Sequence, residues 1–251
     1  MIKATNQVCF FSFFIFVALT SLALLLTGCT QLTPGGTFTQ KLEQPNDIIQ
    51  KKAALIGESR PEFSFLGNAD QYIPLVKKYA EKYNVDWILV LSTIRQESRF
   101  HSDAISYQGA GGLMQIMPLT QIELSEKLGM REAMSPRNNI IAGVYYFSSL
   151  YQALRGSTKD DRLRITLAAY NAGLARIQDA QAIARYLGED PHRWSSVSNA
   201  LSLLTKKNYT LHQLVWEDYR PPSGYFKDSK QTIGYVDDIM SRFNQYSLAL
   251  R

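Results

Sequence analysis

The stretch Ile94–Pro118 reads I-R-Q-E-S-R-F-H-S-D-A-I-S-Y-Q-G-A-G-G-L-M-Q-I-M-P. Its first residues continue an apolar run with helical spacing that begins at Val85, and Asp86 is the predicted N-cap. Glu97 falls in the last turn of this predicted helix. The negative end of the helix dipole, together with any burial, favours the protonated form of a carboxyl group there. The position fits a general acid working near neutral pH, and it also fits an ordinary solvated glutamate.

A glycine-rich segment follows Glu97 after a polar turn at residues 102–107. Gly109, Gly111 and Gly112 allow positive backbone angles or a close approach of the backbone to a ligand. The apolar segment behind them contains one amide, Gln115, which needs a hydrogen-bond partner. Gln115 either makes a structural hydrogen bond or faces a cleft as a polar group. The spacing of the residues does not distinguish these two interpretations.

Three segments resemble the successive motifs of SLT-type lytic transglycosylases, the bacterial murein-cleaving relatives of goose-type lysozyme. They are E-S-R-F at 97–100, A-I-S-Y-Q-G-A-G-G-L-M-Q-I-M-P at 104–118 and A-A-Y-N-A-G at 168–173. Three motifs in this order form a specific signal. The resemblance implies a lysozyme-like, all-α catalytic domain whose partner is the peptidoglycan glycan strand.

By this resemblance, Glu97 is the only catalytic carboxylate. It protonates the glycosidic oxygen between N-acetylmuramic acid and N-acetylglucosamine, and then takes a proton from the muramoyl 6-hydroxyl, with help from the 2-acetamido group. The product is a 1,6-anhydro end. A glycosidase with two carboxylates needs the second within about 5 to 10 Å. The nearest acid in sequence, Asp103, is interpreted as part of the polar turn because the family does not use that position as a nucleophile.

The resemblance also implies residues that surround the substrate, and Tyr170 is expected to face Glu97 and to orient or stabilise it. The expected substrate-binding residues are Ser98, Ser106, Met114, Gln115, Tyr146, Tyr170, Asn171 and Tyr235.

One segment departs from the family. The family usually has Glu-Thr-Arg-x-Tyr-Val near its C-terminus, whereas this chain reads Q-T-I-G-Y-V at 231–236. Gln231 replaces the acid and Ile233 the arginine, while Tyr235 matches. The substrate contacts at that end of the cleft are therefore expected to differ.

The N-terminus has the pattern of a secretory signal, with one charge at Lys3 and an apolar run that ends in Leu-Thr-Gly-Cys at 26–29. This ending resembles a bacterial lipobox and implies cleavage before Cys29 and lipidation of that cysteine. The alternative is a retained membrane-anchor helix, since the run is nearly long enough to span a bilayer. Because Thr30 and not Asp follows the cysteine, we expect a lipoprotein on the periplasmic face of the outer membrane.

These features predict three parts: a signal peptide at 1–28, a lipidated tether with a short N-terminal segment at 29–68, and the catalytic domain at 69–251. The mature chain has no cysteine pair for a disulfide. The three histidines have no metal-ligand spacing, so neither a metal nor a cofactor is predicted, although His101 lies near Glu97 in sequence. The formal net charge is +5, and the basic residues form no stripe, which argues against a nucleic-acid partner.

From residue 69 onward the apolar spacing is helical, and strand signals are nearly absent, so the predicted fold class is all-α (mainly helical). The segment at 138–155 has the longest apolar stripe and is expected to form the core. Aromatic residues at 188–228 are interpreted as core in preference to sugar-stacking platforms. The predicted helices are 69–83, 85–97, 118–128, 138–155, 160–171, 174–187, 197–205 and 234–246.

Two alternative functions remain open. A goose-type lysozyme-like hydrolase shares Glu97 and the fold but releases a reducing sugar. A murein-binding lipoprotein of the cell envelope without catalytic activity is the second alternative, and the intact motifs argue against it.

Overall fold

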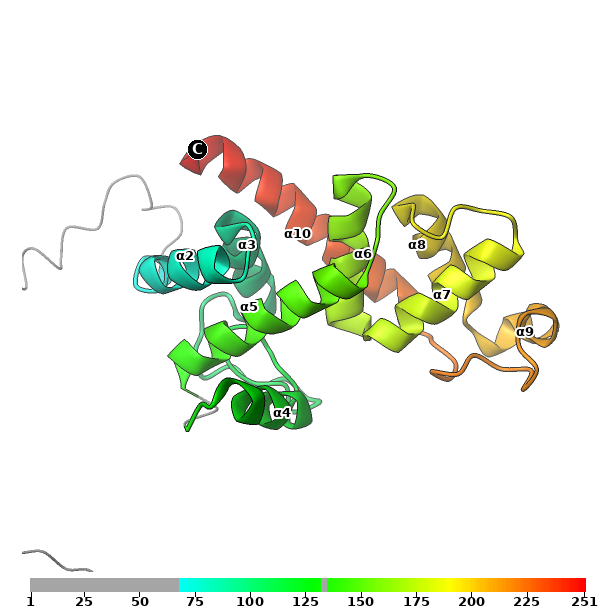
Figure 1. Cartoon of the computed structure of the whole chain (residues 1–251), viewed down its shortest axis with the longest axis horizontal. Coiled ribbons are helices and arrows are strands. Elements are labelled where there is room, and N and C mark those ends of the chain that lie inside the picture. The colour runs from blue at the N-terminus through cyan, green and yellow to red at the C-terminus, as the bar shows by residue number, and fades with distance from the viewer. Residues whose placement is uncertain (1–67, 132–134) are drawn as a thin grey trace, which may run out of the picture. The chain divides into compact units, whose positions relative to one another are not determined.

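The computed structural model describes residues 68–131 and 135–251, and all of these residues fall in one compact unit (Figure 1). The predicted signal peptide, Cys29 and nearly all of the tether lie outside the described residues. Among the described helices, none is long and apolar enough to cross a membrane.

The described part of the chain is helical and forms no β-strand, which confirms the predicted all-α class. The helices are α2 (Ile73–Lys82), α3 (Trp87–Ser98), α4 (Pro118–Leu128), α5 (Pro136–Ala153), α6 (Lys159–Ala172), α7 (Leu174–Tyr186), α8 (Trp194–Leu203), the short 3-10 helix η2 (Lys206–Asn208), α9 (Tyr209–Val215) and α10 (Ser229–Leu250).

Local capping explains several helix boundaries. The Asp86 side chain accepts a hydrogen bond from the backbone of Ile88 at 2.9 Å and starts α3, as its sequence position predicts. Ser135 caps α5 through the backbone of Asn138. Gly129 ends α4 in the left-handed conformation, with φ 62°.

Two segments differ from the sequence prediction. Residues 206–215, expected as loop, form η2 and α9. Helix α10 extends beyond the predicted 234–246 at both ends, because Gly234 lies inside the helix and does not begin it. Ser229 and Thr232 are buried on the same helix as Tyr235, so packing overrides the low helix propensity of glycine.

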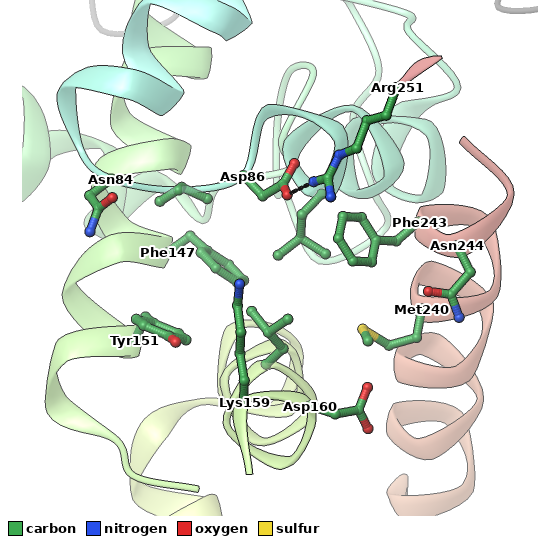
Figure 2. Close-up of a pocket in the computed structure, with 13 residues that line it drawn as sticks. Asn84, Asp86, Phe147, Tyr151, Lys159, Asp160, Met240, Phe243, Asn244 and Arg251 are labelled. Atoms are coloured by element: carbon green, nitrogen blue, oxygen red, sulfur yellow. Dashed lines mark hydrogen bonds and ion pairs between the residues drawn. The ribbon is translucent and has the colours of Figure 1, made fainter. Parts of the chain in front are cut away.

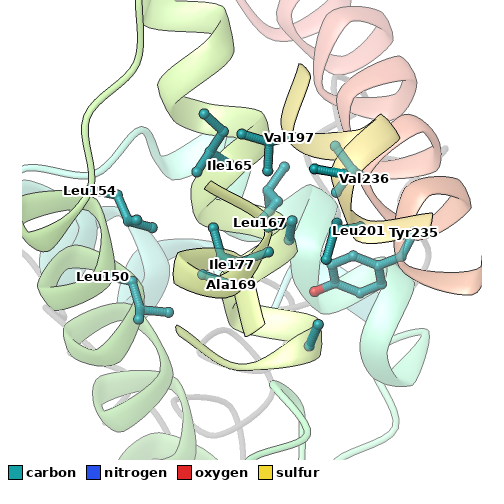
Figure 3. Packing of buried hydrophobic residues seen from close by; sticks show 14 of the residues in the cluster. Leu150, Leu154, Ile165, Leu167, Ala169, Ile177, Val197, Leu201, Tyr235 and Val236 are labelled. Atoms are coloured by element: carbon teal, nitrogen blue, oxygen red, sulfur yellow. The ribbon is translucent and has the colours of Figure 1, made fainter. Parts of the chain in front are cut away.

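The core consists of two clusters of buried side chains. The larger one joins α5, α6, α7, α8 and α10, and Figure 3 shows its Leu150, Ile165, Ile177, Leu201 and Val236 converging from these helices. The smaller one joins α2, α3, the glycine-rich loop and α5. Full burial of each Leu or Ile side chain contributes about 1.5 to 3 kcal/mol, so these clusters supply most of the stabilising energy.

Helix α10 packs along α3 and also contacts α6 and α8 (Figure 1). A polar contact fixes this pairing, in which Arg242 Nη1 donates to Gln96 Oε1 at 3.0 Å. Gln96 directly precedes Glu97, so α10 covers the end of α3 that carries the candidate acid.

The glycine-rich loop is held from α5 by Asn139, which is 1% exposed. Its Oδ1 accepts from the Met114 backbone at 2.8 Å, and its Nδ2 donates to the Gly111 carbonyl at 3.0 Å. Gly112 has φ +79°, and a Cβ added there would lie 2.6 Å from the Asn139 side chain. Glycine is required because the left-handed backbone and the close approach of Asn139 occur together.

We expect Gly112→Ala to lower the free energy of unfolding by about 2 to 4 kcal/mol, because backbone strain adds to overpacking against Asn139. Gly129→Ala is the matched control: it also has a positive φ, but nothing lies within 4 Å of the added Cβ. It should lose only about 1 to 2 kcal/mol. Urea unfolding of both variants measures the difference, and equal losses would contradict this account of the loop.

Candidate active site

Glu97 occupies the last turn of α3, and the chain leaves the helix abruptly after it. Arg99 and Phe100 both have positive φ, at 52° and 67°. Ser98 stabilises this exit, since its hydroxyl donates to the Ile94 carbonyl and accepts from the Phe100 backbone, both at 3.2 Å. Phe100 is 3% exposed and anchors the exit in the smaller core cluster.

A cavity of about 440 Å3 lies at the end of α3. Four parts of the chain surround it: the end of α3, the glycine-rich loop with the first turn of α4, the middle of α5, and the junction of α6 and α7. Its lining residues are Glu97, Ser106, Gln108, Ala110, Gln115, Ile116, Met117, Thr120, Tyr146, Tyr170, Asn171, Ala172, Gly173 and Arg176.

The environment of Glu97 favours its protonated form. Burial raises the pKa of its carboxyl from 4.5 to about 7, and a hydrogen bond from Tyr235 opposes part of that rise. The Tyr235 hydroxyl donates to Glu97 Oε1 at 2.6 Å. Burial and the nearby Glu97 raise the pKa of Tyr235 well above its usual value, so its hydroxyl stays protonated and can donate. A carboxyl group with a pKa of about 7 can both give and take a proton near neutral pH.

Tyr170 contributes to the wall of the cavity. Its hydroxyl donates to the Met114 carbonyl at 2.8 Å, and its ring centroid lies 5.5 Å from that of Tyr146. Both tyrosines pack against both core clusters. The cavity therefore lies where the two clusters meet.

Comparison with known proteins identifies the domain that contains this cavity. The sequence profile of the transglycosylase SLT domain matches residues 74–192. Residues 74–192 of this chain form an SLT domain. The profile spans the helix that carries Glu97, the glycine-rich loop and the junction of α6 and α7, so every residue that lines the cavity lies inside the SLT domain.

Two curated relatives are similar to this chain over more residues than the SLT profile spans. The membrane-bound lytic murein transglycosylase F of Desulfosudis oleivorans is 31% identical over 69% of this chain and 36% of its own length. The protein of the same name from Hahella chejuensis is 35% identical over 55% of this chain and 27% of its own. This chain thus spans about a third of the length of these relatives.

A solved structure supports the fold. The inactive variant of lytic transglycosylase Slt from Pseudomonas aeruginosa superposes with a TM-score of 0.50, at 22% sequence identity, over 80% of this chain and 28% of the other. The similarity between that structure and this chain is a similarity in the path of the backbone.

Several residues predicted from the motifs line the cavity of the SLT domain together. They are Glu97, Ser106, Gln115, Tyr146, Tyr170 and Asn171. Gln115 combines both of its predicted roles: it lines the cavity, and its amide nitrogen donates to the carbonyls of Ala104 at 3.0 Å and Gly112 at 2.9 Å. The Asn171 side chain accepts from Thr232 at 2.8 Å, which ties it to α10.

The other three predicted substrate-binding residues are not among the residues that line the cavity. Ser98 is 7% exposed and supports the helix exit. The Met114 side chain is 1% exposed and packs against Gly143, although its carbonyl binds Tyr170. Tyr235 is 7% exposed and contacts Glu97. Direct sugar contacts by these three side chains remain predictions, and their observed contacts are structural.

Tyr170 lines the same cavity as Glu97, and burial together with the charge of Glu97 raises the pKa of Tyr170, but the hydrogen bond to Glu97 comes from Tyr235. The hydroxyl of Tyr170 is used by the glycine-rich loop, whereas the hydroxyl of Tyr235 reaches Glu97. The family resemblance matched both tyrosines, but their hydrogen bonds depend on how α10 packs on α3. Gln231 and Ile233, which depart from the family pattern, do not line the cavity.

Sequence reasoning missed Gln108, Thr120 and Arg176, which also line the cavity. Arg176 follows the A-A-Y-N-A-G motif by three residues. The sharp turn at Gly173, with φ +93°, brings the start of α7 back to the cavity. Gly173 is the sequence feature that could have indicated Arg176, because it marks the turn after which α7 returns to the cavity.

A larger cavity of the described structure, about 630 Å3, lies elsewhere (Figure 2). It is bounded by α3, α5, α6 and α10, and Arg251 pairs with Asp86 at its edge. No residue from the three motifs lines it. The smaller cavity is the candidate active site because it contains the carboxyl group with the shifted pKa. His101 and Asp103 line neither cavity.

Because the Tyr235 hydrogen bond lowers the pKa of Glu97, Tyr235→Phe should raise that pKa above about 7. Carbon-13 NMR titration of the glutamate carboxyl groups measures the shift. Tyr170→Phe is the matched control, because the Tyr170 hydroxyl binds a backbone carbonyl and not Glu97. An unchanged or lower pKa of Glu97 in Tyr235→Phe would show that the hydrogen bond does not stabilise the carboxylate.

Proposed function

We propose that this protein is a peptidoglycan lytic transglycosylase that cleaves the β-1,4 bond between N-acetylmuramic acid and N-acetylglucosamine. The proposal rests on Glu97, a partly buried carboxyl group whose pKa is raised to about 7 in the cavity of an SLT domain. The relatives that share this domain bear the name lytic murein transglycosylase.

Glu97 acts twice in the proposed reaction. Its protonated form gives a proton to the glycosidic oxygen as the bond from that oxygen to the muramoyl anomeric carbon breaks. Its carboxylate then takes the proton of the muramoyl 6-hydroxyl as that oxygen bonds to the anomeric carbon. The carboxyl group is regenerated and no water is consumed. A pKa near the working pH suits both steps.

The absence of a second acid from the cavity wall favours this route over hydrolysis. Glu97 is the only Asp or Glu among the described residues that line the cavity. A hydrolase with two carboxylates needs a partner acid to attack or to activate water. An intramolecular hydroxyl that is already close to the anomeric carbon has a high effective concentration and needs no such partner.

Glu97→Gln should reduce cleavage of purified murein sacculi by roughly a hundred to ten thousandfold, because the amide keeps the shape of the carboxyl group but cannot transfer its proton. Asp103→Asn is the matched control, since Asp103 is exposed and does not line the cavity. It should retain wild-type turnover. Normal turnover by a folded Glu97→Gln variant would remove Glu97 from the mechanism.

The glycan ends released from sacculi should be 1,6-anhydro-muramoyl ends. Mass spectrometry of unreduced muropeptides should show products lighter by one water than hydrolysed ones, and these products should resist borohydride. Reducing ends as the main product would assign a lysozyme-like hydrolase to the same site.

We also propose that a lipid on Cys29 anchors the protein to the periplasmic face of the outer membrane, on the strength of the Leu-Thr-Gly-Cys ending and of Thr30 after it. The relatives are named membrane-bound enzymes. The tether after Cys29 would give the catalytic domain reach into the murein layer.

Cys29→Ala should move the protein out of the outer-membrane fraction when cells are fractionated. Cys9→Ala is the matched control, because Cys9 lies inside the predicted signal and should not carry lipid. If both variants stay in the outer-membrane fraction as firmly as the wild type, another feature anchors the protein.

A further inference from the structure

Arg176 is the single cation among the described residues that line the cavity, and Glu97 is the single anion. The two do not form an ion pair. The pKa of Glu97 responds to burial and to Tyr235, without a contribution from Arg176. Two other arginines, Arg164 and Arg251, do form ion pairs with acidic side chains.

The guanidinium of Arg176 is fixed in place from one side. Its Nη1 donates to the Ala172 carbonyl at 2.7 Å, and its central carbon lies 5.0 Å from the centroid of the Phe226 ring. Phe226 is 6% exposed and belongs to the larger core cluster. A charged side chain held by a buried aromatic ring and a helix carbonyl has lost much of its rotamer freedom before any ligand binds.

Most of the donors of this guanidinium have no partner within the described residues. Its Nε is buried and makes no hydrogen bond, and Nη1 makes the one bond to Ala172. An arginine carries five N–H donors in a planar fork that matches a carboxylate. A buried unpaired donor is destabilising, so a ligand that pairs with it gains affinity by removing that cost.

We propose that Arg176 binds a carboxylate of the muramoyl substrate, either the lactyl carboxylate or one from the peptide stem. This inference rests on the proposed function. Each muramoyl sugar bears its lactyl group on the ring whose anomeric carbon would react at Glu97. The lactyl carboxylate is free where the peptide stem has been removed, and where a stem is attached the stem supplies carboxylates of its own. Uncharged glucosamine polymers bear no carboxylate. A cation in the same cavity as the acid therefore selects muramoyl glycan over neutral glycan.

The N-terminal turn of helix α7, which carries Arg176, also favours an anion at this place. Helix α7 begins at Leu174 with no side-chain cap, and Gly173 lines the cavity. The first N–H groups of this 13-residue helix carry partial positive charge and add to the field of Arg176.

The test uses Glu97→Gln as the background, because this variant is expected to bind glycan without cleaving it. Three probes are titrated by calorimetry: a peptide-free tetrasaccharide of alternating N-acetylglucosamine and N-acetylmuramic acid with free lactyl carboxylates, its methyl ester, and the same tetrasaccharide with peptide stems. The Glu97→Gln variant should bind at least one carboxylate-bearing probe about ten to a hundredfold more tightly than the ester. Preference for the peptide-free acid identifies the lactyl group, and preference for the peptide-bearing probe alone identifies the stem.

In the Glu97→Gln background, the second substitution Arg176→Gln should abolish the preference for carboxylate-bearing probes and leave the affinity for the methyl ester unchanged. Arg185→Gln is the matched control, because Arg185 lies exposed on the same helix and its replacement alters the net charge equally. It should keep the preference. If Arg176→Gln does not fold, Arg176→Lys decides, since a point charge without the planar fork should weaken the preference.

Two outcomes overturn the inference and are distinguishable. If the Glu97→Gln protein binds ester and acids equally, or if the preference survives replacement of Arg176, the carboxylate subsite is wrong while the proposed function stands. If the Glu97→Gln protein binds none of the three probes, the proposed function fails and this inference fails with it.

Discussion

The hydrogen bond from Tyr235 to Glu97 joins two helices through residues 138 positions apart in the chain. It exists because α10 packs along α3, an arrangement that the contact between Arg242 and Gln96 reinforces one residue away. Burial under α10 destabilises the carboxylate, and the phenol of Tyr235 stabilises it. The pKa of about 7 is the balance of these two opposing effects, so the chemistry proposed for Glu97 depends on the docking of the last helix.

The part of the cavity wall that the glycine-rich loop forms depends on a second set of long-range contacts. The glycine-rich loop has almost no regular structure of its own, and side chains from other helices hold its backbone. Asn139 binds it from α5 and Tyr170 from α6. Because both of these residues belong to well-packed helices and Leu113 and Met114 of the loop are themselves buried, the loop is positioned by the core, as a preorganised binding site requires.

The cavity also separates its charged groups. Glu97 is covered by α10, whereas Arg176 reaches the cavity from the start of α7, and no ion pair joins them. Direct pairing would lower the pKa of Glu97 and remove its capacity to act as an acid near neutral pH. Keeping the cation on another helix is consistent with the proposed carboxylate ligand, because the cation then leaves the acid protonated.

The sequence by itself determined the helical class, most helix boundaries, the candidate acid and the motif residues around it. The helical class and the helix boundaries follow from local rules: apolar periodicity, caps such as Asp86 and Ser135, and glycines at sharp turns. The candidate acid and the residues around it follow from the resemblance of three motifs to the SLT family. Only the tertiary structure decided that Tyr235 and not Tyr170 binds Glu97, that Met114 is buried, and that Arg176 enters the cavity. The physical reason is that a hydrogen bond needs its two atoms within about 3 Å. For residues far apart in the chain, that distance is set by how whole helices pack, which no local pattern encodes.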